Sequence, residues 1–418
     1  MNLLKLSWKN LTNKPLTMLL SIVLFALGVG LISLLFLLEN QLQKNFEKNL
    51  AGIDLVIGAK GSPLQMILSS MYHIDAPTGN ISLGEIRPFL NPKHPLIETA
   101  IPLSMGDSYR GYRILGTEPK ILDLYGVELA RGELWKRNFE ATVGASVATE
   151  LGLEIGDEFS SSHGFTDNDD FAHDLNFRVV GILEPSGTVM DQLILCTTQS
   201  FWLVHEHEME IGGSEESEEE HDDHASIPQS LTQEPDDKEI TSLLIKFKGR
   251  NFQALNMQRS INENTDLQAA TPAIEINRLF SLMDTGEQAL RVLAVVIIFV
   301  SGLSVFISLF SSLKDRKYEL ALMRVMGASP RKLFSLIVLE GLLLALLGFV
   351  VGILLSHGGM QLFAGAMQEA YRYTFSGLEF LREEVYLFFG ALGIGFLAAI
   401  LPAIRAASTD ISETLSEG

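Results

Sequence analysis

Four stretches of the chain are apolar and almost free of charge over about 20 residues each. They are expected at 16–38, 292–313, 333–355 and 385–404, and only the third contains an acid, Glu340. A helix of about 20 apolar residues crosses the roughly 30 Å hydrocarbon core of a bilayer. Helices in the core of a soluble protein rarely stay uncharged on every face for that length. The sequence therefore predicts four membrane spans, and the first is too long to be read as a cleaved signal peptide.

Lysine and arginine are distributed unevenly among the segments that flank these spans. Residues 1–15, an amphipathic segment, hold three, residues 314–332 hold six and residues 356–384 hold two. Cytoplasmic loops carry the excess of basic residues. We therefore expect 1–15, 314–332 and the tail 405–418 to be cytoplasmic, whereas the loop 356–384 and the domain 39–291 are expected to be external.

The expected external domain is acidic and has the patterns of a mixed α/β fold. It holds 19 basic and 41 acidic residues, and the formal charge of −20 for the whole chain argues against a nucleic-acid partner. Short runs of β-branched and aromatic residues predict strands at 53–58, 177–183 and 242–247. A short helix is expected to end at Gly152, and amphipathic helical stalks are expected at 38–50 and 277–291. The predicted fold class is thus an α+β membrane protein with this domain between spans one and two.

Residues 205–238 are expected to form an acidic, histidine-rich loop, because too few apolar residues remain there to offset the cost of ordering. The loop contains His205, His207, His221 and His224. Imidazole and carboxylate groups are good ligands for zinc or a similar divalent ion, so weak metal capture is one interpretation. The alternative is a solvated acidic insertion. Cys196 is the only cysteine, so no intramolecular disulfide can form.

Motifs for nucleotide hydrolysis, zinc proteolysis and ester hydrolysis are all missing. The sequence has no G-x-x-x-x-G-K-[ST], no H-E-x-x-H and no G-x-S-x-G. We therefore do not expect the chain to be an enzyme by itself.

The segment 314–332 has the pattern of a short helix, a corner and the start of a longer helix. The apolar side of the short helix is expected to comprise Leu320, Met323, Val325 and Met326. Gly327 can end it in the left-handed conformation, and Ser329 and Pro330 offer an N-cap and a first residue for the next helix.

This segment resembles the signature of the MacB/FtsX-like permeases of ATP-binding-cassette (ABC) systems, which typically read E-[IL]-[AG]-[IL]-[LM]-[RK]-[AV]-[LM]-G-A. Residues 319–328 read E-L-A-L-M-R-V-M-G-A and match every place. Residues 339–352 and 401–410 are similar to later parts of such permeases, and residues 131–133, 143–157 and 177–183 are similar to their external domain.

The resemblance implies a permease with four spans that works in a dimer, either homodimer or related heterodimer, in the bacterial cytoplasmic (inner) membrane. The chain has no fused ATPase, so a separate ABC ATPase subunit that binds ATP and Mg is implied, whereas this chain would hold no cofactor. ATPase-driven movement would be relayed to the external domain for export or release of a substrate, with a periplasmic adaptor or carrier as a further partner. Its implied coupling residues are Glu319, Arg324, Gly327, Ala328, Ser329 and Pro330.

Two other functions stay open at this point. One is an FtsX-like signalling or scaffold subunit that controls an external partner without transport, and the other is an ABC system that handles metal through the histidine-rich loop. Substrate and direction of movement are also open. Within the third span, Glu340 is expected to make a helix contact, with transport chemistry as the alternative. Gly348 and Gly352 form a G-x-x-x-G pattern that permits two helices to approach closely.

Overall fold

A computed structural model describes residues 3–163, 172–211, 230–249, 252–371 and 375–408. The chain divides into two compact units. The sheet unit comprises Lys44–Ser281, and the helical unit comprises Met1–Gln43 together with Leu282–Gly418.

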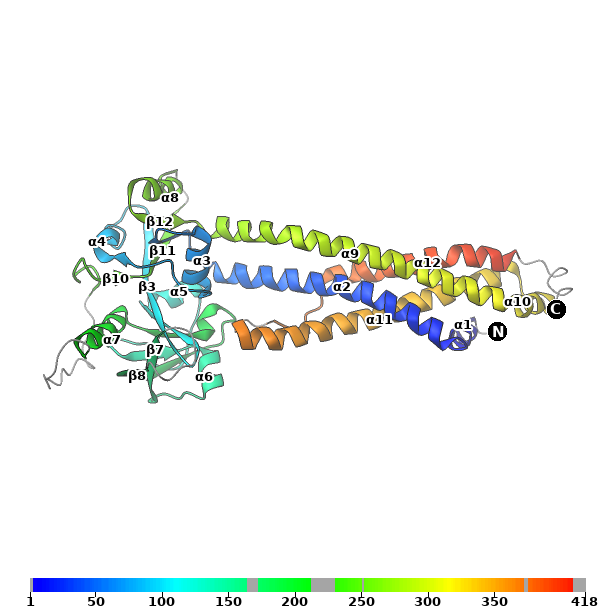
Figure 1. Ribbon diagram of the computed structural model, residues 1–418, viewed down its shortest axis with the longest axis horizontal. Coiled ribbons are helices and arrows are strands. Elements are labelled where there is room, and N and C mark those ends of the chain that lie inside the picture. The colour runs from blue at the N-terminus through cyan, green and yellow to red at the C-terminus, as the bar shows by residue number, and fades with distance from the viewer. Residues whose placement is uncertain (1–2, 164–171, 212–229, 250–251, 372–374, 409–418) are drawn as a thin grey trace. The chain divides into compact units, whose positions relative to one another are not determined.

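The sheet unit is built on a mixed ten-stranded sheet with the order β12-β1-β11-β3-β4-β9-β6-β8-β5, in which β7 pairs with β3 and β8 (Figure 1). Pairing is antiparallel except between β4 and β9 and between β6 and β8. The strands are β1 (Leu55–Ala59), β3 (Ile97–Tyr109), β4 (Tyr112–Thr117), β5 (Leu129–Gly132), β6 (Glu140–Val143), β7 (Glu158–His163), β8 (Ala172–Leu183), β9 (Leu193–Cys196), β11 (Ser242–Phe247) and β12 (Leu267–Ala270). β2 (Ile81–Ser82) and β10 (Glu239–Ile240) pair separately.

The three strands predicted from β-branched runs are confirmed as β1, β8 and β11. Short helices surround the sheet: α3 (Pro63–Tyr72), α4 (Leu83–Ile86), α5 (Lys120–Tyr125), α6 (Ala145–Leu151), α7 (Thr198–Ile211), α8 (Phe252–Asn264) and the 3-10 helix η2 (Val189–Gln192). α6 ends at Gly152 with a φ of 66°, as the glycine pattern predicts. The apolar core has two parts, one around Phe139, Phe159 and Phe177 and the other around Leu55, Ile57 and Leu243.

The expected loop at 205–238 differs from the structure at its N-terminal end, because residues 205–211 continue α7. Its C-terminal end agrees, since β10 begins at Glu239. The helix continues because Glu, Met and Ile support helical backbone, and because α7 is already nucleated by its buried residues Phe201 and Val204. Residues 212–229 lie outside the described residues.

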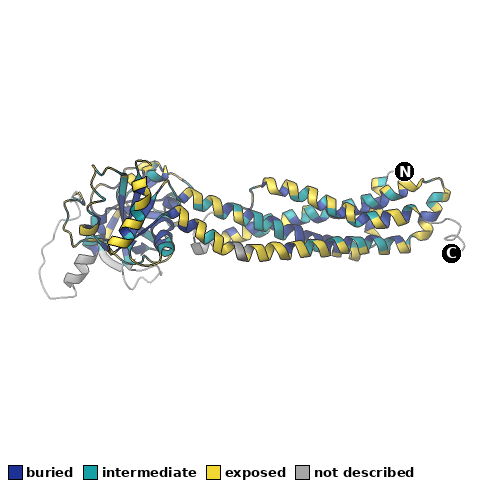
Figure 2. Cartoon of the chain, turned by 90° about the horizontal axis from the view of Figure 1, so that it is seen from above, coloured by how far each residue is buried: buried dark blue, intermediate teal, exposed yellow. Residues whose placement is uncertain are grey.

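Among the described residues, four helices are long and apolar enough to cross a membrane. They are α2 (Pro15–Asn49), α9 (Pro272–Asp315), α11 (Pro330–Tyr371) and α12 (Arg382–Ala407). The short helix α1 (Leu3–Thr12) precedes α2, and α10 (Lys317–Val325) lies between α9 and α11. α2, α9, α11 and α12 contribute to one apolar cluster, which includes Phe25, Val305, Leu344 and Ala391. Figure 2 shows buried residues on the inner sides of these helices and exposed residues on their outer sides.

Each of the four helices is longer than the span predicted for it. The expected loop at 356–384 is helical to Tyr371 and again from Arg382. Residues 356–371 contain no proline and include good helix formers, so nothing stops the helix where the apolar stretch ends. The expected stalks likewise continue α2 to Asn49 and start α9 at Pro272.

Candidate functional site

The corner between α9 and α11 is formed by α10 and the turn that follows it. Gly327 has a φ of 95°. The amide of Ala328 donates to the Met323 carbonyl at 2.9 Å, which closes the helix end. Pro330 is the first residue of α11, where its missing N–H has no intrahelical partner to lose. The turn therefore fixes the direction in which α11 leaves α10.

One face of α10 is anchored inside the helical unit. Leu320 and Ala321 are buried, and Leu320 packs in a cluster with Leu333 and Leu336 of α11. Arg324 donates to the Ala407 carbonyl near the end of α12 at 3.4 Å. Ala328 is partly buried, whereas Glu319, Ser329 and Pro330 are exposed.

The other face of α10 presents large apolar side chains to its surroundings. The exposed fractions are 54% for Tyr318, 44% for Leu322, 57% for Val325 and 72% for Met326. Their spacing of four, three and one residues places them on one side of a helix. The sequence grouped Val325 and Met326 with buried Leu320. The structure separates them, because positions five and six residues apart are not on the same face of a helix.

Glu340 of α11 is fully buried and lies in a polar cluster with α1 and the end of α9. Its carboxylate accepts two bonds from the Arg316 guanidinium, at 3.1 and 3.3 Å, and a third from the Asn10 amide at 2.7 Å. Arg316 also contacts the Ser312 hydroxyl and carbonyl. The carboxylate therefore contacts protein groups that neutralise its charge, and this is the arrangement that a buried ion pair needs.

Gly348 and Gly352 lie where α11 meets α2. A Cβ at Gly348 would come within 2.8 Å of Phe25, and one at Gly352 would come within 2.8 Å of the Ala26 carbonyl oxygen. Gly30 of α2 is also close to the Gly352 backbone, since a Cβ there would lie 3.0 Å from the Gly352 oxygen. The helices thus touch through their backbones at this point.

A second buried carboxylate, Glu384, was missed by the sequence analysis. It accepts a hydrogen bond from Ser33 of α2 at 2.8 Å, and its Oε1 lies 2.9 Å from His357 Nε2 of α11. The other ring nitrogen, Nδ1, lies 2.6 Å from the Gly377 carbonyl oxygen. Glu384 also accepts from the Leu381 amide, but the sequence did not mark this helix start, because Leu381 lacks the side-chain oxygen of a capping box.

The four histidines proposed as metal ligands are not brought together by the described structure. His205 and His207 lie on the last turns of α7, where only the backbone is described, and His221 and His224 lie outside the described residues. Within the described part of the chain, no group of three His, Cys, Asp or Glu residues is arranged to hold a metal ion. Metal capture stays a prediction.

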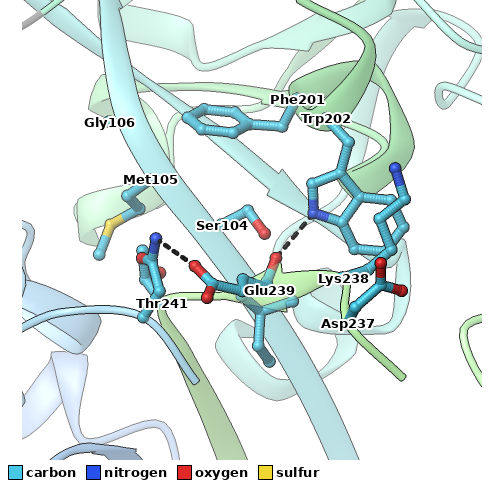
Figure 3. Close-up of a pocket in the computed structure, with 11 residues that line it drawn as sticks. Ser104, Met105, Gly106, Phe201, Trp202, Asp237, Lys238, Glu239 and Thr241 are labelled. Atoms are coloured by element: carbon cyan, nitrogen blue, oxygen red, sulfur yellow. Dashed lines mark hydrogen bonds between the residues drawn. The ribbon is translucent and has the colours of Figure 1, made fainter. Parts of the chain in front are cut away.

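The sheet unit contains a pocket of about 500 Å³ between β3, β10 and α7 (Figure 3). Trp202 forms part of its wall and donates from Nε1 to the Glu239 carbonyl at 2.7 Å. The Glu239 side chain accepts from Asn80 at 3.0 Å. Ser104 is buried, and its hydroxyl has no hydrogen-bond partner among the described residues. The pocket combines aromatic and acidic groups, and the sequence did not predict it, although Asp237 and Lys238 of its lining lie at the end of the expected loop at 205–238.

Two further buried groups of the sheet unit have shifted pKa values. Burial, with a smaller contribution from Arg113, lowers the pKa of His73 to about 3. His73 Nδ1 lies 3.2 Å from the sulfur of Met105, which also lines the pocket. Burial, with a contribution from Asp107, raises the pKa of the Cys196 thiol. Both groups are therefore uncharged near neutral pH.

Comparison with known proteins gives consistent matches over most of the chain. The family described as the MacB-like periplasmic core domain matches residues 18–237, more than half of the chain, and the FtsX-like permease C-terminal family matches residues 291–411. A curated relative, the macrolide export ATP-binding/permease protein MacB of Shewanella oneidensis, is 22% identical over 344 residues, or 79% of this chain. The chain spans about half of that relative's length, namely 47%.

Three of the similar solved structures are domains of transporters or permeases. The periplasmic region of MacB from Actinobacillus actinomycetemcomitans covers 56% of this chain and 97% of its own, with 12% identity and a TM-score of 0.33. The extracellular domain of YknZ from Gram-positive bacteria covers 52% and 99%, with 9% identity and a TM-score of 0.28. A permease domain from Porphyromonas gingivalis covers 52% and 86%, with 16% identity and a TM-score of 0.25.

The two family matches together extend from the first apolar helix to the end of the last one. They include both the signature at 319–328 and the domain that precedes it. The chain therefore belongs to the MacB/FtsX-like permease family of ABC transporters.

Proposed function

We propose that the chain is the permease subunit of an ABC transporter, and that it relays movement driven by a separate ATPase subunit to its external domain for export or release of a substrate. The single observation that carries this proposal is the exposed apolar face of α10, formed by Tyr318, Leu322, Val325 and Met326. In this proposal, ATP and Mg bind to the partner, and a second permease copy completes the assembly.

An exposed apolar face next to a buried one suits a helix that joins two bodies. Exposed large apolar residues gathered on one side of a soluble segment mark a protein or membrane contact. Here the opposite side is fixed by Leu320, by Ala321 and by the bond from Arg324 to α12. A displacement of α10 by a protein bound to its exposed face would therefore be transmitted to α11 and α12 through these contacts.

The direction of the chain in the membrane is part of the proposal. The excess of basic residues in 314–332 supports a cytoplasmic position for α10, on the side where an ATPase would be. The sheet unit then lies on the opposite side of the membrane. Cysteines introduced at Met326 and at Asp266, which is exposed in the sheet unit, test this on intact spheroplasts. An impermeant thiol reagent is expected to label Asp266→Cys but not Met326→Cys, and the reverse result would overturn the orientation.

The docking proposal is tested by a photo-crosslinking amino acid at Met326 in cells that express the full chain from its own locus. The expected product joins this chain to a protein that carries a P-loop ATPase motif. The matched control carries the same group at Leu354, an exposed position on apolar α11. If Met326 yields no ATPase product, or if Leu354 yields the same one, α10 is not the docking helix.

A further inference from the structure

His357 is held in a position where both of its ring nitrogens face hydrogen-bond acceptors. The Gly377 carbonyl, 2.6 Å from Nδ1, can only accept, so Nδ1 must carry a hydrogen. Nε2 lies 2.9 Å from Glu384 Oε1. A neutral imidazole with its hydrogen on Nδ1 is an acceptor at Nε2, and a carboxylate is also an acceptor. One more proton is therefore required between these two atoms.

The neighbouring donors do not supply that proton. The Ser33 hydroxyl donates to the same Glu384 oxygen at 2.8 Å, and the Leu381 amide donates to the other oxygen at 3.4 Å. The Ser356 hydroxyl lies 2.8 Å from Ser33 and also contacts the Ile353 carbonyl. The Ser33 hydrogen lies between Ser33 and Oε1, and the hydrogens of the Leu381 amide and the Ser356 hydroxyl point to other atoms, so none of them lies between Nε2 and Oε1.

The Gly377 carbonyl that fixes the tautomer is itself held in place. The Gly377 amide donates to Gln361 at 3.0 Å, and the preceding residue, Ser376, exchanges two backbone bonds with the Gln41 side chain. A Cβ at position 377 would lie 2.4 Å from the His357 carbonyl oxygen, so this close approach needs glycine. The ring of Phe380 packs beside His357, with centroids 4.6 Å apart.

The charge of the pair depends on that proton. With it, His357 and Glu384 together are neutral, and without it they carry one uncompensated negative charge. Their side chains are only 12% and 6% exposed, so an unpaired charge there is costly. The charged residues nearest to this pair in sequence are Glu379, which precedes α12, and Arg382 and Glu383 in the first turn of α12, whereas Glu39, six residues after Ser33 on α2, pairs with Arg291. Among the contacts described for His357, Glu384 is the titratable partner.

We propose that His357 and Glu384 form a proton-binding site that clamps α2, α11 and α12 together while the proton is bound. Ser33 joins α2 to the site, His357 and Ser356 belong to α11, and Glu384 belongs to α12. Release of the proton turns the contact between the two side chains into a contact between two acceptors. The helices are then free to separate at this end, so a conformational change of the helical unit releases a proton.

Thermal unfolding of the full chain in detergent, measured over a pH series from mildly acidic to mildly alkaline, tests the clamp. The stabilising contact is present while the proton is bound, so the wild-type Tm is expected to fall as pH rises. In Glu384→Gln the amide donates to a neutral His357 and no proton is exchanged, so this part of the pH dependence is expected to vanish. The matched control, Glu340→Gln, is expected to lower Tm at every pH and to keep the wild-type slope. A wild-type slope in Glu384→Gln would overturn the clamp.

Spectroscopy of the same full chain tests whether the proton is bound at this site, independently of any measurement of stability. Nitrogen spectra of histidine-labelled protein at neutral pH, assigned by comparison with His357→Gln, are expected to show a His357 ring protonated at both nitrogens. A protonated Glu384 carboxyl, seen in the infrared spectrum and absent from Glu384→Gln, supports the site equally. A singly protonated ring beside an ionised carboxylate would overturn the proposal.

Discussion

Two buried carboxylates among the described residues of the helical unit, Glu340 and Glu384, are satisfied by different chemistry. Glu340 is paired with Arg316, whose guanidinium stays charged at any physiological pH, and with the neutral amide of Asn10. Glu384 is paired with His357, a side chain that carries a positive charge only when both of its ring nitrogens are protonated. The first cluster is therefore a permanent ion pair, whereas the second depends on a proton. The difference shows that two acids at helix contacts of one small bundle can have unrelated roles.

The largest effect is expected from breaking the permanent pair with Arg316→Met. The change leaves Glu340 buried with only Asn10 as a charge-stabilising partner, so the free energy of unfolding should fall by about 3–5 kcal/mol. Denaturant titration of the full chain in detergent measures it. Arg291→Ala is the control, because its pair with Glu39 is about half exposed. Equal losses in the two variants would show that burial of the pair is irrelevant.

The next effect concerns α11 between the two clusters. Gly352→Ala would place a Cβ 2.8 Å from the Ala26 carbonyl and force α2 away, at a cost of about 1–3 kcal/mol. Because α2 carries Ser33, the same variant should also weaken the proton-dependent cluster while leaving the Glu340 cluster intact. Gly365→Ala, on the same helix with nothing within 4 Å, is expected to be neutral or slightly stabilising. A loss of stability in both variants would mean that the helix contact is not the cause.

A buried histidine of the sheet unit sharpens the comparison, because its pH dependence has the opposite sign. His73 has a pKa of about 3 when folded, against about 6.5 when unfolded, so the unfolded chain binds more protons between these values. Stability is therefore unaffected above about pH 6.5 and is lost as pH falls below it, by on the order of 1 kcal/mol at pH 5.5. His73→Asn, which tolerates the φ of 53° at this position, should abolish that loss. The difference in unfolding free energy between variant and wild type across the acid range measures it, and a pH-independent difference would contradict the assignment.

The smallest effect is expected from the exposed pair between α2 and α9. Arg291 and Glu39 lie 2.8 Å apart, but both side chains are well solvated. Arg291→Ala should change the free energy of unfolding by about 0–1 kcal/mol, and high salt should cancel the change. A larger loss of unfolding free energy, or one that high salt does not cancel, would show that this pair behaves like the buried clusters.

Local patterns predicted the elements better than they predicted the contacts. Charge-free stretches identified the four long helices, and Gly327 with Pro330 located the corner, because these signals lie within a few neighbouring residues. Glu340 was visible as a lone acid, but its partner Asn10 is 330 residues away in sequence. The short strands β5, β6 and β9, of four residues each, carry too few side chains for a recognisable alternation.

The His357 site was missed for a different physical reason. A hydropathy window ends a span where apolar residues end, and this placed His357 and Glu384 in a loop. Helices end where capping or proline ends them. α11 therefore continues past His357, and α12 begins before Glu384. Polar residues at the ends of apolar stretches can thus contact one another across a helix bundle. Residue type alone does not reveal such contacts.

The position of β1 in the sheet has a consequence for how the protein is made. β1 is the first strand to leave the ribosome, yet its two partners are β11 and β12, which come almost 190 and more than 200 residues later. The sheet is therefore incomplete until nearly the whole unit has been synthesised, and pairing over such separations is slow. Until then Leu55, Val56 and Ile57 present an unpaired apolar strand, which is prone to aggregate. The demand for chaperones should accordingly be highest before residue 270 emerges, and nascent chains truncated before β11 should aggregate more than chains that include β12.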